Sequence, residues 1–292
     1  MERPLRTNVD RPLAIVVGAN DVGSATAVAL HRAGYAVVVC EDVDPAWLRR
    51  GMAFTNAWYV GGAEVDGIDA VFCASVRSIP TVLSQGELVA ATTWSWSGVA
   101  ASLAPAAVVH ASRRAGADLD LRATPAHAWT AVGIGAGFVA GGNVDLIVES
   151  APGSALGSVI RSGPALPRTD VVRDLAGVGN ERFVRASASG RFVTRHRIGA
   201  AVVRGEHVGA IGMTPVIAPI SGVLRGLTAR GALVREGIRV VEVDPRGDPT
   251  LCFGMGERPR AIAEGVLAAL AERNIASQPP WAAARSSREL TA

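Results

Sequence analysis

The chain has 292 residues, a length near which a single hydrophobic core gives way to two domains. Its composition is 49% hydrophobic, which excludes a disordered protein, and its net charge of +3 is too small to indicate nucleic-acid binding. All 29 basic residues are arginines. The three cysteines are widely spaced and form no CxxC pair, which disfavours a disulfide framework and a structural zinc site.

The N-terminal part predicts an α/β unit. Leu13–Gly18 is an apolar run that ends in glycine, Val22–Ala33 repeats apolar residues at helical spacing, and Ala36–Cys40 is a second apolar run. Further buried strands are expected at Ala70–Ala74, Leu88–Thr92, Ala107–His110, Thr130–Gly135 and Val144–Glu149. This βαβ opening predicts a Rossmann-like domain with a parallel sheet over residues 11–150.

The second half of the sequence differs from the first in composition and in its expected elements. Residues 151–184 are rich in Gly, Pro and Ser and indicate a connecting region. Residues 185–250 form short strands bounded by glycine turns, which is typical of the small all-β barrel-sandwich that carries biotin or lipoyl groups. Such carriers attach their group to a lysine, so this lysine-free module holds no covalent biotin or lipoyl. Residues 251–273 predict a C-terminal helix, and residues 274–292 a tail.

The loop after the first strand is the first candidate binding site. It reads Gly18-Ala-Asn20-Asp21-Val-Gly23, a dinucleotide fingerprint in which Asn20 replaces the middle glycine. Asn tolerates a positive φ, but its side chain occupies the space that a phosphate would need. Glu41 follows the second strand, where an acid binds a ribose hydroxyl in dinucleotide sites. These residues are predicted to bind a cofactor, although many domains of this kind hold another ligand or none.

Two further features could hold an anion. Arg49 and Arg50 are placed to clamp a phosphate or carboxylate, or else they end a solvated helix. Gly133, Gly135 and Gly137 belong to a glycine cluster that could form a nest of backbone N–H groups, or else a tight turn between packed strands.

No catalytic arrangement is visible in the sequence. The five histidines show no ligand spacing, so we predict no metal ligand, and no Ser-His-Asp set is supported, so no catalytic residue is assigned. Trp94 and Trp96 could stack on a flat heterocycle, or serve as core or interface residues. The chain shows no signal peptide, and its apolar stretch 128–148 is broken by glycines, so we expect a cytoplasmic protein away from the membrane.

Several of these stretches together resemble one family, the accessory proteins of selenium-dependent molybdenum hydroxylases, over about residues 13–270. The resemblance depends mainly on Ile220-Ser-Gly-Val-Leu-Arg-Gly, Val243-Asp-Pro-Arg-Gly-Asp-Pro and Cys252-Phe, with support from Gly-Ala-Asn-Asp-Val-Gly near the N-terminus. The chain departs from the family pattern at strand ends, where Thr93 and His110 stand in place of acidic residues.

The resemblance implies a maturation factor rather than an enzyme. It implies that the Rossmann-like domain binds a nucleotide-bearing ligand, the molybdopterin cofactor or NAD(P), and that the partners are molybdenum hydroxylase subunits. No nucleic-acid or membrane partner is expected. Whether the protein forms a homo-oligomer is left open. The alternatives are an NAD(P)-dependent oxidoreductase and a non-catalytic structural subunit of a larger complex.

Overall fold

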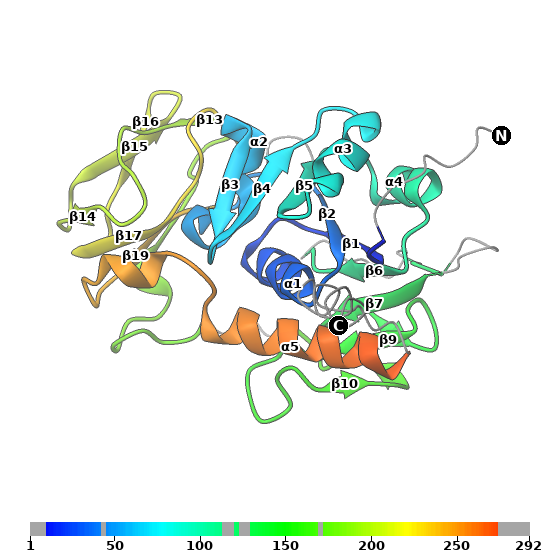
Figure 1. The fold of residues 1–292 in the computed structure, drawn as a ribbon. Coiled ribbons are helices and arrows are strands. Elements are labelled where there is room, and N and C mark those ends of the chain that lie inside the picture. Colours follow the sequence, from blue (N-terminus) through cyan, green and yellow to red (C-terminus); the bar gives the residue numbers. More distant parts are fainter. Residues whose placement is uncertain (1–9, 42–44, 113–119, 123–128, 169–171, 274–292) are drawn as a thin grey trace, which may run out of the picture.

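The computed structural model describes residues 10–41, 45–112, 120–122, 129–168 and 172–273. Its largest element is a nine-stranded sheet with the strand order β10-β9-β7-β6-β1-β2-β5-β4-β3 (Figure 1). The strands are β1 (Leu13–Val17), β2 (Ala36–Cys40), β3 (Gly62–Val65), β4 (Ile68–Phe72), β5 (Leu88–Thr92), β6 (Ala107–His110), β7 (Thr130–Ile134), β9 (Leu146–Val148) and β10 (Val159–Ile160). The seven inner strands run parallel to one another.

The βαβ opening lies where the sequence predicts it. Helix α1 (Asp21–Arg32) begins after Asn20, whose side chain accepts hydrogen bonds from the first free N–H groups of the helix. It ends before Gly34, which has a φ of +90°. After β2 the chain forms the 3-10 turns η1 (Arg50–Met52) and η2 (Phe54–Asn56) and the short helix α2 (Ala57–Val60).

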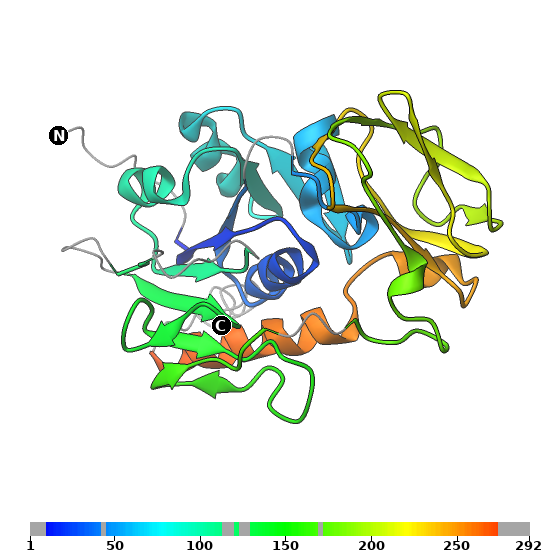
Figure 2. The same cartoon turned by 180° about the vertical axis from the view of Figure 1, so that it is seen from behind.

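Both faces of the nine-stranded sheet are covered. Helix α1 packs on one face together with α5 (Glu257–Glu272), the last described helix. Helices α3 (Ile79–Ser84) and α4 (Trp96–Leu103) cover the opposite face, with the 3-10 turn η3 (Val76–Ser78) ahead of α3. Figure 2 shows α5, in orange, in the lower part of the molecule, next to the green strands that precede the small sheets. No helix among the described residues is long and apolar enough to cross a membrane.

Two four-stranded antiparallel sheets lie beside the large sheet and enclose their own apolar core (Figure 1). The first has the order β12-β19-β17-β14, and the second has the order β16-β15-β13-β18. Their strands are β12 (Phe183–Arg185), β13 (Gly190–Val193), β14 (Ala201–Val202), β15 (His207–Ile211), β16 (Thr214–Ile217), β17 (Gly222–Leu227), β18 (Leu233–Val234) and β19 (Arg239–Asp244). The 3-10 turn η4 (Asn180–Arg182) precedes β12, and η5 (Pro249–Cys252) follows β19.

The predicted fold class is therefore wrong. The large sheet is mixed rather than parallel, because β3 pairs antiparallel with β4 and β10 pairs antiparallel with β9. The region taken for one barrel-sandwich consists of two four-stranded sheets, and β8 (Val139–Ala140) with β11 (Gly163–Pro164) forms a further small antiparallel pair. The physical reason for the first difference is the Asp66-Gly67 turn, in which both residues have positive φ and close the β3–β4 hairpin.

Candidate functional site

The loop between β1 and α1 makes its own hydrogen bonds to the helix N-terminus. Asn20 Oδ1 accepts from the N–H groups of Val22 at 3.0 Å and Gly23 at 3.1 Å, while its Nδ2 donates to the Ala111 carbonyl at 2.8 Å. The side chain of Asn20 therefore occupies the donors that hold a phosphate in dinucleotide sites.

The glycines of this loop are required by close packing. A Cβ on Gly23 would lie 1.9 Å from the Gly18 carbonyl oxygen, and a Cβ on Gly18 would lie 2.9 Å from the Ser112 nitrogen. Glu41 turns back onto the same loop, where its Oε2 accepts from the Ala19 N–H at 2.9 Å. The structure thus brings Gly18, Asn20, Asp21, Gly23 and Glu41 together, while their role in binding a cofactor stays a prediction.

His110 lies at the end of β6, two residues before the backbone that packs on Gly18. The ring is buried and meets Phe138 edge-on, with centroids 5.4 Å apart. Burial lowers the pKa of His110 to about 4, so the imidazole is neutral at physiological pH. Its Nδ1 has no hydrogen-bond partner among the described residues.

The second glycine cluster is explained by packing on Phe138 and Ser150. A Cβ on Gly133 would lie 2.3 Å from Phe138, and a Cβ on Gly135 would lie 2.0 Å from Ser150 Oγ. Gly135 and Gly137 both have positive φ, as tight turns require. Gly133 stands two strands away from β1, beside His110, so the cluster does not join the Gly18 loop. Anion binding by these three glycines stays a prediction.

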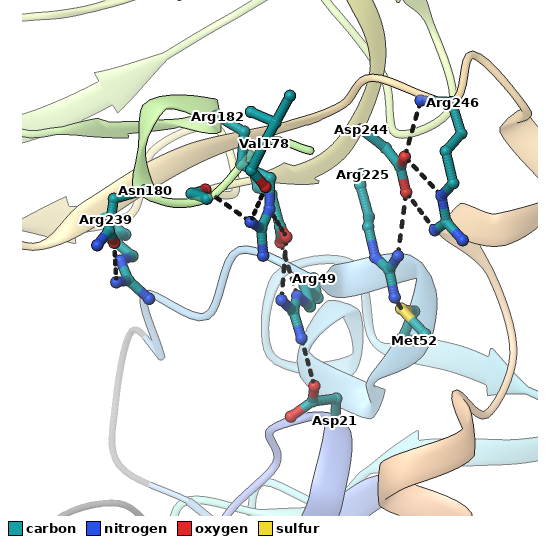
Figure 3. Close-up of polar contacts among 12 residues, drawn as sticks. Asp21, Arg49, Met52, Val178, Asn180, Arg182, Arg225, Arg239, Asp244 and Arg246 are labelled. Atoms are coloured by element: carbon teal, nitrogen blue, oxygen red, sulfur yellow. Dashed lines mark hydrogen bonds and ion pairs between the residues drawn. The ribbon is translucent and has the colours of Figure 1, made fainter. Parts of the chain in front are cut away.

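Arg49 forms a buried ion-pair network with Glu242 of β19. Its Nε and Nη2 donate to the two carboxylate oxygens of Glu242 at 2.6 and 3.0 Å, and its Nη1 donates to Asp21 of α1 at 3.1 Å (Figure 3). Arg182 Nε donates to the same carboxylate at 3.1 Å. Burial opposes ionisation of Glu242, but Arg49, Arg225 and Arg182 outweigh it and hold the pKa of that carboxyl below its usual value. The donors of Arg49, which were predicted to bind an anion, thus bind the carboxylates of Glu242 and Asp21.

A second buried carboxylate lies two residues along β19. Asp244 is fully buried and pairs with Arg225 at 3.0 Å and with Arg246 at 2.6 Å (Figure 3). Burial opposes ionisation of Asp244, but the hydrogen bonds from Arg246 and Arg225 outweigh it and lower its pKa to about 2. Cys252, nearby, is fully buried, and burial raises the pKa of its thiol to about 11, which makes a thiolate role unfavourable.

Arg50, the neighbour of Arg49, lines a pocket of about 680 Å³. The pocket lies between the segment 50–60, which includes α2, and the small sheets. One wall is formed by Arg50, Asn56, Tyr59 and Val60, and the other by Thr194, Arg195, His196, Arg197, Ala229 and Arg230. Figure 1 shows α2 next to β13, the strand that ends just before Thr194. Pockets at the junction of two structural units are common ligand sites.

The pocket is rich in positive charge and has no acidic residue in its lining. Arg195, Arg197 and Arg230 are exposed and have no ion-pair partner within the described part of the chain. Arg50 is held in place, because its Nε donates to the Leu227 carbonyl at 2.7 Å and its Nη1 to Asn56 Oδ1 at 2.6 Å.

Sequence reasoning identified Arg50 and missed the other basic residues of the pocket. Their signal was the triplet Arg195-His196-Arg197 at the end of a predicted strand. The tryptophans predicted to stack on a heterocycle lie elsewhere: Trp94 is 45% exposed and donates to the Ala74 carbonyl, while Trp96 meets Trp129 edge-on. No group of three His, Cys, Asp or Glu residues among the described ones is arranged to hold a metal ion.

No protein-family model matches the chain. The chain is 31% identical over 258 residues to the uncharacterized protein YqeB of Escherichia coli strain K12. The match covers 88% of this chain and 47% of YqeB, so the chain spans about half the length of that curated relative.

Solved structures of several enzymes show a weak similarity. A succinylglutamate desuccinylase/aspartoacylase from Rhodobacter sphaeroides is 25% identical over 25% of this chain and 23% of its own, with a TM-score of 0.20. The ectoine utilization protein EutE from Ruegeria pomeroyi is 14% identical over 80% of this chain and 53% of its own, with a TM-score of 0.21. A succinylglutamate desuccinylase from a Silicibacter species is 11% identical over 81% of this chain and 85% of its own, with a TM-score of 0.24.

These comparisons contradict the predicted resemblance. The proteins found are desuccinylases, an aspartoacylase, an ectoine utilization protein and YqeB, and none of these is an accessory protein of a molybdenum hydroxylase. The assignment as a maturation factor was wrong, and the oxidoreductase and structural-subunit alternatives gain no support. The prediction of a non-enzyme conflicts with these neighbours as well, since they are enzymes. At TM-scores of 0.20 to 0.24, no activity of these enzymes is transferred to this chain.

Proposed function

We propose that the protein binds a small molecule with two or more negative charges, such as a phosphorylated or polycarboxylate compound, in the pocket between α2 and the end of β13. The observation that carries the proposal is the set of three arginines, Arg195, Arg197 and Arg230, that face one pocket without an acidic partner in its lining. The pocket that these residues share with Arg50 is called the arginine pocket below.

The charge arrangement favours an anionic ligand. Cations that face one another across a pocket repel, and a bound anion reverses that repulsion. The guanidinium group presents a planar fork of N–H donors that matches carboxylate and phosphate oxygens. Tyr59, Val60 and Ala229 add apolar contact area on both walls. Such a combination suits a ligand with charged groups attached to a small organic body.

Binding of inorganic pyrophosphate and of citrate, measured by isothermal titration calorimetry at low salt, tests the proposal. Binding is expected for the wild-type chain, weakening as salt increases because the site is open to solvent. In the variant Arg195→Gln/Arg197→Gln we expect affinity to fall about tenfold or more, since a hydrogen bond to a charged group contributes about 1.5–3 kcal/mol.

The matched control is Arg204→Gln. Arg204 is an exposed arginine of the same small sheets that does not line the pocket, so its loss removes one charge without touching the site. Equal affinities in the wild type, the double variant and the control would show that any anion binding is non-specific, and the proposal would fail.

A further inference from the structure

His196 lies in the wall of the arginine pocket and forms an oriented pair with Glu206. Its Nε2 lies 3.0 Å from Glu206 Oε1, and its backbone N–H donates to Thr194 Oγ1 at 3.0 Å. The other carboxylate oxygen of Glu206 accepts from the Val203 N–H at 2.9 Å. The imidazole is therefore held by a carboxylate that is itself fixed on the turn between β14 and β15.

Glu206 remains ionised over the range in which histidine titrates. The Val203 N–H, followed by His196, holds the pKa of this carboxyl below its usual value. An ionised carboxylate at hydrogen-bond distance favours the imidazolium form of its partner.

The remaining charged and titratable groups of the pocket act in the opposite direction. Arg195 and Arg197 flank His196 in sequence, Arg230 follows β17, and Arg50 and Tyr59 face it from the α2 wall. Four guanidinium groups disfavour a fifth positive charge as long as the pocket holds no anion. A bound anion cancels that repulsion, so the balance between Glu206 and the arginines then shifts toward the imidazolium.

We propose that anion binding in the arginine pocket is coupled to uptake of one proton by His196. The inference rests on the proposed function and adds its regulation: the ligand binds more tightly to the imidazolium form. By linkage, the effect of the proton on ligand binding equals the effect of the ligand on proton binding. Affinity then decreases as the pH rises and the imidazolium loses its proton, by at most about tenfold per pH unit for a single proton.

The test compares pyrophosphate affinity from pH 5.5 to pH 8.5 in the wild type and in His196→Gln. Pyrophosphate changes its own charge over this range, but this change is common to both proteins, so the ratio of their affinities reports on His196. We expect the wild type to bind about tenfold more tightly than the variant at the acidic end, and the two to converge at the alkaline end. Calorimetry in two buffers with different ionisation enthalpies should show less proton uptake by the variant, by about half a proton at most, which is the uptake that a tenfold coupling allows.

Two further variants complete the experiment. Glu206→Gln removes the charge that favours the imidazolium, so its affinity should rise only at a lower pH than in the wild type. His207→Gln changes an exposed neighbouring histidine outside the pocket lining and should keep the wild-type profile. Circular dichroism verifies that each variant is folded.

The outcomes separate the two proposals. If pyrophosphate fails to bind the wild type at any pH, the arginine pocket is not an anion site and the proposed function falls. If the wild type binds but His196→Gln has the same pH profile, the site stands and only the proton coupling is overturned.

Discussion

Arg49 and Arg50 are adjacent in sequence, but their side chains point in different directions and have different partners. Arg49 turns inward and pairs with Glu242 and Asp21, whereas Arg50 faces the pocket. The difference comes from their partners, because a fully buried carboxylate needs a cation close by while a backbone carbonyl merely orients one. Of these two neighbouring arginines, one therefore holds a buried carboxylate and the other lines the arginine pocket.

Removal of the Glu242 charge should destabilise the protein strongly. In Glu242→Gln, Arg49 and Arg182 keep their buried positions but lose the carboxylate between them, and breaking one side of a buried pair costs about 3–5 kcal/mol. Urea denaturation at neutral pH measures the change. Glu257→Gln is the control, because the Glu257–Arg173 pair is exposed and its loss should leave the midpoint unchanged. A Glu242→Gln midpoint equal to the wild type would show that the network is not structurally important.

Helix α5 contacts the large sheet through a glycine. A Cβ on Gly265 would lie 2.1 Å from the Gly157 carbonyl oxygen and 2.7 Å from Val148. The backbone of the segment before β10 therefore runs directly against the helix, which only a glycine allows.

This contact predicts an unusual result for Gly265→Ala. Alanine in place of a helical glycine ordinarily stabilises a helix by about 1 kcal/mol. At this position the added methyl group has no space, so we expect the free energy of unfolding to fall, by about 1–3 kcal/mol. Gly98→Ala in α4 provides the comparison, since its nearest neighbour is the Ser95 hydroxyl oxygen at 3.1 Å and no backbone atom lies as close as at Gly265. Stabilisation by Gly265→Ala would show that α5 does not pack as closely as described.

The elements that sequence patterns predicted are those with strong local signals. The run Leu13–Gly18 and the helical spacing of Val22–Ala33 predict β1 and α1 without any knowledge of tertiary contacts. The β3–β4 hairpin was missed because β3 is only partly buried and lacks a continuous apolar run, although its Asp66-Gly67 turn is a recognised hairpin signal.

The predicted site residues that meet in the structure belong to one βαβ opening, namely the loop after β1 and Glu41 at the end of β2. Gly18, Asn20, Asp21 and Gly23 are close in sequence and meet as expected. The arginine pocket combines residues near 50, 195 and 230, which come together only through packing of the small sheets against α2. A local sequence pattern cannot predict contacts between residues that are far apart in the chain. For the same reason, sequence spacing could not show that Arg49 pairs with Glu242, which is 193 residues away.

Across the whole molecule, positive charge is concentrated in the small sheets. Residues 183–248 contain ten arginines against five acidic residues, a net charge of +5 compared with +3 for the complete chain. Two of the five acidic residues, Glu242 and Asp244, are fully buried in ion pairs. The surface of this part is therefore basic, and a basic surface attracts anions before contact.

The free energy of unfolding should decrease at acidic pH because Asp244 becomes protonated. Its pKa of about 2 in the folded state lies below the usual value, so the ionised pair stabilises the fold above about pH 4 and is lost as the pH falls toward about 2. We expect Asp244→Asn to be less stable at neutral pH and to lose less stability over that acidic range. Urea midpoints from pH 7 to pH 2 measure this, with the exposed Asp69→Asn as a control. Parallel curves for the wild type and Asp244→Asn would refute it.

The packing of α5, the last described helix, against α1, the first, has a consequence for the order of folding. Among the described elements, α5 is the last to leave the ribosome, after every strand of the sheet that it covers and after both small sheets. Until then the face of the large sheet around α1, β9 and β10 has no cover, and its apolar residues stay open to water. Closure therefore joins segments more than 200 residues apart, a long-range step that slows folding and leaves a period in which a chaperone can hold the nascent chain.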